Sequence, residues 1–160
     1  MAIRNIVQGD DPLLRKKSRD VTDYNKRLHQ LLDDMYETMQ KAEGVGLAAV
    51  QVGALRRVIV VDVGDGKYEI VNPVITFRSE EEECAQEGCL SFPGEYGAVP
   101  RPAKVSIEGF DRHGAPVSYT GEGYLARAFC HEVDHLDGIV FHDREVEMPE
   151  GEDADGDIDE

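Results

Sequence analysis

The sequence predicts an α+β fold, because apolar strand patterns lie together between one early and one late helical pattern instead of alternating with helices. The chain has 160 residues, of which 41% are hydrophobic and 31% are charged. This length is typical of a single domain that buries its own core without disulfides. We therefore expect one domain over residues 1–147, followed by a tail over residues 148–160.

The first predicted helix has apolar residues at helical spacing, namely Leu28, Leu31, Leu32, Met35 and Met39. Thr22 or Asp23 is expected to cap its start, because both residue types accept hydrogen bonds from the first helical N–H groups. The pattern ends at Gly44. The apolar stripe indicates a helix face that packs on the core.

Four segments have strand patterns, in two pairs that we expect to form hairpins. The first pair is Arg57–Val63 and Glu69–Ile75, and the second is Lys104–Phe110 and Ala115–Tyr119. Their β-branched residues favour strands, and the glycine and aspartate residues between the members of each pair favour turns. Two antiparallel strand pairs are therefore predicted between the two helices.

The net charge of −16 is concentrated in two acidic blocks. The glutamates at 80–83 and the seven acids of Met148–Glu160 account for eleven of these charges. Such blocks are usually solvated, so we expect the tail to be disordered and dispensable for catalysis. An acidic surface repels phosphate, which argues against direct nucleic-acid binding.

Membrane and secreted proteins are disfavoured classes for this chain. No apolar run approaches the roughly 18 residues that cross a bilayer, and the N-terminus lacks the apolar core of a signal peptide. The three cysteines, Cys84, Cys89 and Cys130, are too few and odd in number for a disulfide framework. We therefore expect a cytoplasmic protein in which cysteine serves a metal, catalysis or packing.

The last predicted helix runs from about Gly123 to Leu136 and contains the motif H-E-x-x-H, with His131 and His135. Residues four apart project from one helix face, so both imidazoles can bind one metal ion. Glu132 lies about 100° around the helix from His131. It can therefore take a proton from a water molecule that the metal activates, which predicts hydrolysis of a carbonyl compound.

A third ligand is needed, because two histidines alone rarely hold a catalytic divalent ion. In the metzincin pattern the third histidine falls at position 141, which is Phe141 here, and His142 misses it by one residue. His113 and His29 are predicted on the surface. Cys130 is expected to pack in the core, because it points away from the face that carries the two histidines.

Cys89 is the favoured third ligand, and we expect it on an exposed strand within Glu87–Ser91. A thiolate with two imidazoles suits iron(II), zinc, nickel or cobalt and leaves a fourth position open for water. The alternative is a closed structural site formed by both histidines with Cys84 and Cys89. Its gap of 41 residues before the histidine pair fits no short zinc finger, and it gives Glu132 no role.

The glycine-rich segment Gly44–Gln51 follows the first helix. It can form a tight turn between helix and strand, or its backbone can approach a ligand closely. In the second interpretation the side-chain amide of Gln51 donates a hydrogen bond to that ligand. The segment lacks the G-x-x-x-x-G-K-[ST] pattern of a phosphate-binding loop.

Gly44–Gln51, Glu87–Ser91 and His131–His135, in this order and at these intervals, resemble the peptide deformylase family. Asp11–Arg15 and His135–Gly138 extend the resemblance over most of residues 1–147. The resemblance implies antiparallel β-sheets packed around a central metal-binding helix. It also implies a metal-dependent hydrolase that removes the formyl group from the initiator formyl-methionine of nascent polypeptides and releases formate.

The same resemblance implies roles for individual residues. The ligands of one divalent metal ion, iron(II) in most cells and zinc in some, would be Cys89, His131 and His135. Glu132 would act as general base and then as general acid. The catalytic partners that stabilise the oxyanion would be the amide of Gln51 and the backbone N–H of Leu90. The substrate-binding residues would be Gly44, Val45, Gly46, Gly88, Arg127 and Ala128.

Two features depart from the family pattern. Tyr96 stands at the position where many members have an arginine that pairs with the substrate. Several members end in a basic helix that docks on the ribosome, whereas this chain ends in acids, so ribosome docking is not carried over. The expected partners are N-formylmethionyl nascent peptides, with neither nucleic acid nor membrane, and we expect a monomer.

Two other functions compete with this interpretation. A zinc endopeptidase shares the helix motif and Glu132, but the Cys89 segment and the absence of a third histidine at position 141 argue against it. A metal-stabilised binding module without catalysis would not need Glu132. An inactive relative of the deformylases is disfavoured, because every residue that the chemistry needs is present.

Overall fold

The structure is a computed structural model that describes residues 2–147, and within that range it contains two α-helices, three 3₁₀ helices and seven strands. The helices are α1 (Lys26–Lys41), α2 (Tyr124–Leu136), η1 (Pro12–Arg15), η2 (Ala49–Val52) and η3 (Phe141–Asp143). The strands are β1 (Gly46–Ala48), β2 (Val58–Val61), β3 (Tyr68–Arg78), β4 (Glu82–Glu87), β5 (Gly97–Pro102), β6 (Lys104–Phe110) and β7 (Pro116–Glu122). The predicted tail, residues 148–160, lies outside the described residues.

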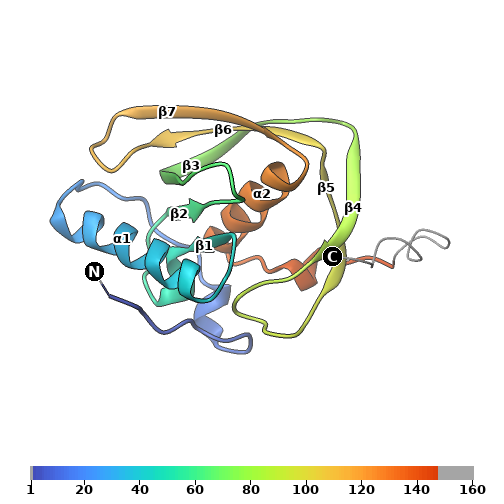
Figure 1. Ribbon diagram of the computed structural model, residues 1–160, viewed down its shortest axis with the longest axis horizontal. Coiled ribbons are helices and arrows are strands. Elements are labelled where there is room, and N and C mark those ends of the chain that lie inside the picture. The colour runs from blue at the N-terminus through green and yellow to red at the C-terminus, as the bar shows by residue number, and fades with distance from the viewer. Residues whose placement is uncertain (1, 148–160) are drawn as a thin grey trace.

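Two antiparallel sheets surround one helix. Five strands pair in the order β1-β2-β3-β6-β7, and β4 pairs with β5 in a separate ribbon. Figure 1 shows α2 in the middle of the molecule, with β3, β6 and β7 running past one side of it and the β4–β5 ribbon past another. The predicted α+β fold with a central helix is confirmed.

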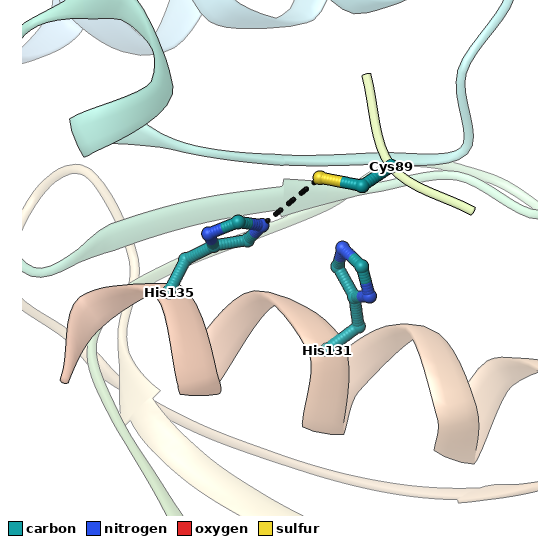
Figure 2. A group of neighbouring side chains, drawn as sticks. All are labelled: Cys89, His131 and His135. Carbon is teal, nitrogen blue, oxygen red and sulfur yellow. Dashed lines mark hydrogen bonds between the residues drawn. The ribbon is translucent and has the colours of Figure 1, made fainter. Parts of the chain in front are cut away.

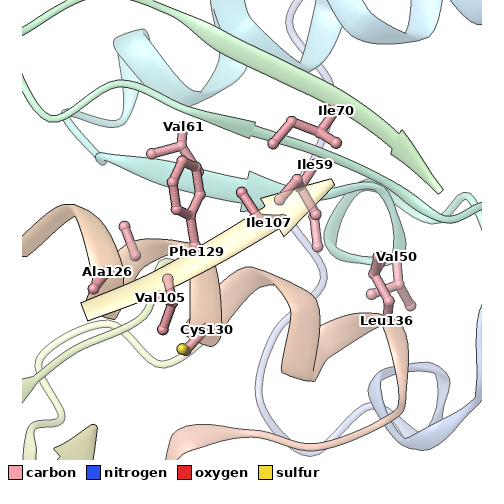
Figure 3. Close-up of a cluster of buried hydrophobic side chains, with 12 residues drawn as sticks. Val50, Ile59, Val61, Ile70, Val105, Ile107, Ala126, Phe129, Cys130 and Leu136 are labelled. Carbon is pink, nitrogen blue, oxygen red and sulfur yellow. The ribbon is translucent and has the colours of Figure 1, made fainter. Parts of the chain in front are cut away.

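The apolar side of α2 packs on the five-stranded sheet. Figure 3 shows Phe129 of α2 among side chains of β2 and β6, including Val61 and Ile107. Phe129 is fully buried, and burying such a ring contributes roughly 1.5–3 kcal/mol. This contact fixes the helix relative to the sheet, and it leaves the opposite side of α2 free to face β4 and the loop that follows it.

The other helix, α1, covers a second apolar cluster. Its predicted stripe of Leu28, Leu31, Leu32, Met35 and Met39 is buried, together with β2 and η2. The predicted cap is wrong by two to three residues, because Asn25 accepts the hydrogen bond from the Leu28 N–H (3.1 Å). The preceding chain stays extended, since Asn72 bonds both the N–H and the C=O of Val21.

The predicted hairpins are confirmed, with different boundaries. β2 pairs with β3 and β6 pairs with β7, both antiparallel. β3 extends to Arg78, three residues past the predicted end, because it continues to pair with β6. β1, β4 and β5 were not predicted. The acidic run at 80–83 is exposed as expected, but its last two residues begin β4.

No helix among the described residues is both long enough and apolar enough to cross a membrane.

Candidate active site and metal centre

Helix α2 supplies three site residues from its polar face. His131, Glu132 and His135 are 7%, 4% and 0% exposed. Burial of this many polar groups is costly unless they are hydrogen-bonded or bind a ligand. The helix can carry them because its other face, with Phe129 and Leu136, holds it on the sheet.

Cys89 reaches the same place from the other side of the cleft. It lies in the loop after β4, so the prediction that it sits on a strand is wrong; β4 ends at Glu87, where its pairing with Gly97 ends. Its Sγ lies 3.3 Å from Nε2 of His135. Figure 2 shows Cys89 facing the two histidines, and donor atoms of the three residues all lie within 4.8 Å of one another.

This donor set fits a tetrahedrally coordinated divalent ion. Ligand bonds of about 2.1 Å to nitrogen and 2.3 Å to sulfur place the donor atoms roughly 3.4–3.7 Å apart. Sγ of Cys89 and Nε2 of His135 are 3.3 Å apart, which is close to this spacing. In the part of the chain that the structure describes, no other group of three acidic, cysteine or histidine residues lies close enough to hold a metal.

A buried carboxylate orients His131. Nδ1 of His131 lies 2.8 Å from Oε1 of Glu87, so this nitrogen carries the proton and the lone pair of Nε2 could bind a metal ion. Glu87 also accepts hydrogen bonds from Arg101 (2.7 and 3.1 Å) and Arg127 (2.9 Å). A carboxylate that holds the second nitrogen of a histidine is typical of metal sites.

Glu132 lies beside the group formed by Cys89, His131 and His135 without belonging to it. Its Oε2 is 4.0 Å from Nε2 of His131, and its buried Oε1 has no hydrogen-bond partner among the described residues. A Cβ at Gly46 would lie 2.5 Å from Oε2 of Glu132. Only glycine at this position lets β1 pass so close to the carboxylate, which explains part of the glycine-rich segment.

Gln51 is held in a fixed orientation on η2. Its Oε1 accepts a hydrogen bond from the N–H of Ala48 (3.0 Å), which identifies Nε2 as the donor side. Nε2 donates to Oγ of Ser91 (3.0 Å) and lies 3.5 Å from Sγ of Cys89. The amide therefore points its N–H groups towards the Cys89 loop.

The next residue in that loop, Leu90, offers its backbone. The Leu90 N–H donates no hydrogen bond within residues 2–147, so it is available to a ligand in the cleft that Leu90 lines. The Leu90 side chain packs where a Cβ of Gly44 would lie, at 2.6 Å. Glycine at position 44 thus allows the segment Gly44–Gln51 to lie close to the loop that carries Leu90.

The site opens into one cavity of about 420 Å³. Eleven of the twelve predicted site residues line it, and His135, the twelfth, is fully buried. The remaining lining includes Glu43, Glu87, Tyr124 and the loop residues Phe92, Pro93, Gly94, Glu95 and Tyr96. The cavity is thus an elongated cleft between β1 and the loop, with the polar face of α2 as its floor.

The competing candidates lie elsewhere. His29 on α1 contacts His113 in the β6–β7 turn, with ring centroids 5.2 Å apart. Cys130 is buried in the core cluster, as predicted. Cys84 lies on β4 opposite Pro100, which excludes it from the histidine pair within the described residues.

Burial is the largest single influence on the pKa values of His131, Glu132 and His135. It raises the pKa of Glu132 to about 7, although the charge of His131 acts in the opposite direction. Burial lowers the pKa of His135 well below its ordinary value, and His131 lowers it further. For His131 the opposing burial effect is outweighed by Glu132, Cys89 and Glu87, so its pKa is raised.

Sequence reasoning missed the part that Glu87 and Arg101 play. Both are buried and charged, and they form a bidentate ion pair next to His131. A signal existed: Arg101 lies in a segment of small and apolar residues, Gly97–Pro102, where a charge needs a buried partner. The partner could not be chosen from the sequence, since β4 has no apolar alternation.

Comparison with known proteins decides the family. The polypeptide deformylase model matches residues 3–150. The chain belongs to the polypeptide deformylase family. Members of this family are metallohydrolases that remove the N-formyl group from nascent polypeptides, and this is the activity of the chain.

Individual deformylases are similar to this chain along most of their length. The peptide deformylase of Alkaliphilus metalliredigens is 56% identical over 144 residues, covering 90% of this chain and 97% of that protein. The crystal structure of the Thermotoga maritima enzyme has a TM-score of 0.89 at 40% identity, over 91% of this chain and 99% of that one. The Synechococcus elongatus enzyme, solved in complex with actinonin, has a TM-score of 0.87 at 38% identity, over 90% and 79%.

Proposed function

We propose that Cys89, His131 and His135 hold one divalent metal ion, and that this ion is iron(II) in the cell. The observation that carries the proposal is the approach of the three donor atoms to one another beside Glu132, at the floor of the cleft. A thiolate and two imidazoles suit iron(II), zinc, nickel and cobalt alike, so supply in the cell selects among them. When bound, such an ion supplies Lewis acidity, which polarises a carbonyl oxygen and lowers the pKa of water.

Glu132 is the proton carrier in this proposal. Its carboxylate is buried, and no side chain holds Oε1, so it is available to accept a proton from the attacking water and later to deliver one to the leaving amine. A pKa of about 7 suits both roles at neutral pH. The close passage of Gly46 confines the carboxylate to this position.

Gln51 and Leu90 stabilise the negative charge that develops on the formyl oxygen. Nε2 of Gln51 lies 3.5 Å from Sγ of Cys89, Leu90 directly follows Cys89 in the chain, and both residues line the cleft. Preorganised donors of this kind contribute a few kcal/mol each to the transition state. Ser91 holds the Gln51 amide, so the donor needs little reorganisation during the reaction.

The cleft walls bind the methionine and the peptide backbone. Gly44, Val45 and Gly46 expose the edge of β1, which can pair with an extended peptide. Gly88, Arg127 and Ala128 form the opposite wall and floor. The Arg127 guanidinium donates hydrogen bonds to Glu87 and to two backbone carbonyls. Because its donors are engaged in this way, we assign Arg127 a role in shaping the pocket and no charged contact with the substrate.

We also propose a cytoplasmic monomer that does not depend on ribosome docking. A thiolate ligand requires a reducing compartment, and no disulfide joins Cys84, Cys89 and Cys130 among the described residues. The exposed large apolar side chains are spread over several elements, with Val74 and Phe77 on β3 and Tyr124 on α2. Light scattering at working concentration tests the oligomeric state.

The decisive experiment measures formate release from formyl-Met-Ala-Ser. Protein prepared without oxygen and loaded with iron(II) should release formate, and the Cys89→Ala variant should release none and bind no metal. Unformylated Met-Ala-Ser is the control, and its cleavage would indicate an endopeptidase instead. Folded, metal-loaded protein that releases no formate would refute the proposed roles.

A further inference from the structure

We propose that His142 is a positioning residue for this reaction: its protonated imidazole ties the cleft loop, residues 92–96, to the chain segment after η3. The proposal rests on the proposed function, because that loop forms one wall of the substrate cleft. His142 itself does not line the cleft. It acts through Glu95, which does.

Both ring nitrogens of His142 contact carboxylates from different segments. Nε2 lies 2.8 Å from Oε1 of Glu95 in the cleft loop, and Nδ1 lies 2.6 Å from Oε1 of Glu145 after η3. Glu145 in turn packs over Gly97, where a Cβ would collide with its carboxylate. The histidine therefore bridges the loop and the C-terminal segment at the point where β5 begins.

Aromatic contacts hold the ring in that bridge. The imidazole of His142 is 4.1 Å from the ring of Phe141 and 5.1 Å from that of Phe92, measured between centroids. Phe92 is the first residue of the loop, and Phe141 is stacked on His131 at 6.3 Å. The bridge is thus built next to the metal-binding histidine without touching it.

The geometry requires a charged ring. Neutral imidazole has one N–H, so it can donate to only one of two carboxylates, whereas imidazolium donates to both. The other charged groups nearby are engaged elsewhere: Asp143 pairs with Arg15, and Arg144 pairs with Asp134. Glu95 and Glu145 are therefore the charges that face His142.

These contacts also set the direction of the pH dependence. The hydrogen bond to Glu145 has the largest effect and raises the pKa of His142; burial opposes it, and the hydrogen bond to Glu95 adds to it, so the pKa lies above its ordinary value. A raised pKa means that the bridge is complete below the ordinary histidine pKa and is lost as pH rises through the raised one. Above that pH one nitrogen presents a lone pair to a carboxylate, and the loop loses its tie.

The expected kinetic effect falls on substrate binding. In the iron(II)-loaded protein, KM for formyl-Met-Ala-Ser should rise roughly two- to fivefold as His142 loses its proton, the size expected for one partly exposed charge-assisted contact. The value of kcat should follow its own pH profile. In His142→Gln, KM should be high and independent of this titration.

Two further variants separate positioning from mere structural support. His142→Arg keeps a permanent charge that can donate to both carboxylates, so it should hold KM low up to high pH. His113→Gln, which changes an exposed histidine far from the cleft, should behave like the wild type. A purely structural role would alter stability in the His142 variants without removing the pH dependence of KM.

A second readout does not depend on activity. NMR titration of the His142 ring should give a pKa above the ordinary value, and the amide signals of Glu95 and Tyr96 should move with that titration in the wild type but not in His142→Arg. A His142 that titrates normally, or a KM profile that is identical in His142→Gln, would overturn the proposal. Absence of formate release by every variant would instead refute the proposed function, and the NMR titration would still decide the role of His142.

Discussion

The two faces of α2 are both buried, but they bury opposite kinds of side chain. One face places Ala126, Phe129 and Leu136 in the apolar cluster on the five-stranded sheet. The other places His131 and Glu132 at the floor of the cleft and buries His135 next to Cys89. A helix of 13 residues thus contributes to the core on one side and to the candidate active site on the other.

The difference shows where the stability of the site comes from. The apolar face gains free energy from burial, whereas the polar face loses hydration that only hydrogen bonds or a metal can replace. Glu87, Arg101 and Arg127 replace part of it around His131. Oε1 of Glu132 and Nδ1 of His135 are left without a partner among the described residues. We infer that the sheet contact stabilises a helix whose other face is organised for chemistry.

Among substitutions on the two faces of α2, Glu132→Gln should have the largest effect on activity. Removing the proton carrier should lower kcat/KM by roughly 100- to 10,000-fold while metal content stays at one per chain. Because burial raises the pKa of Glu132 to about 7, its charged form disfavours the folded state as pH rises from the ordinary value of 4.5. Above a pH of about 7, where Glu132 of the wild type is charged, metal-free Glu132→Gln should therefore be at least as stable as metal-free wild type. Thermal unfolding measures this difference. A variant that is unstable would show that Glu132 has a structural role.

A substitution on the apolar face of α2 should change stability and leave activity nearly unaltered. Phe129→Ala removes a fully buried ring and should lower the free energy of unfolding by about 3–5 kcal/mol. Urea unfolding of metal-free protein measures the loss. The fraction that remains folded should keep its metal and most of its turnover. Loss of turnover without loss of stability would show that the two faces are not separable.

A residue outside the helix should produce a mixed effect. Glu87→Gln keeps the shape of the side chain but removes the charge that holds His131, Arg101 and Arg127. We expect metal affinity to fall by roughly 10- to 100-fold, the usual cost of losing such a partner. Competition with a chelator measures it, and Glu69→Gln, which removes a half-buried carboxylate paired with Arg112 outside the cleft, is the matched control.

The sequence predicted the elements with regular apolar patterns and missed those that depend on pairing. α1, α2, β2, β3, β6 and β7 carry periodic apolar residues, so their existence followed from hydrophobic spacing. β4 has the sequence EECAQE, with no apolar alternation, and exists because it pairs with β5. Strands of this kind cannot be predicted from local pattern, since their stabilising partner is distant in the chain.

The same distinction holds for the site. His131 and His135 were predictable as a pair, because helical spacing alone brings them together. Cys89 was favoured as the third ligand from its own segment, whereas the oxyanion roles of Gln51 and Leu90 came from the family resemblance; the fold accounts for the approach of Cys89 and Gln51 to one another. Arg101 and His142 were assigned no role at the sequence level, because each acts through a carboxylate that only the tertiary structure brings to it.

Cys130 provides the finest test of the comparison, because it is adjacent to His131 in sequence but belongs to the apolar face. It is buried among core residues, and burial raises the pKa of its thiol. Cys130→Ala should therefore cost only about 1 kcal/mol of stability, the value for losing one small buried group, with kcat/KM and metal content unchanged. A change in turnover larger than twofold would mean that the two faces of α2 are coupled through the helix itself. An unchanged turnover would show that one peptide unit is enough to separate a core position from a site position.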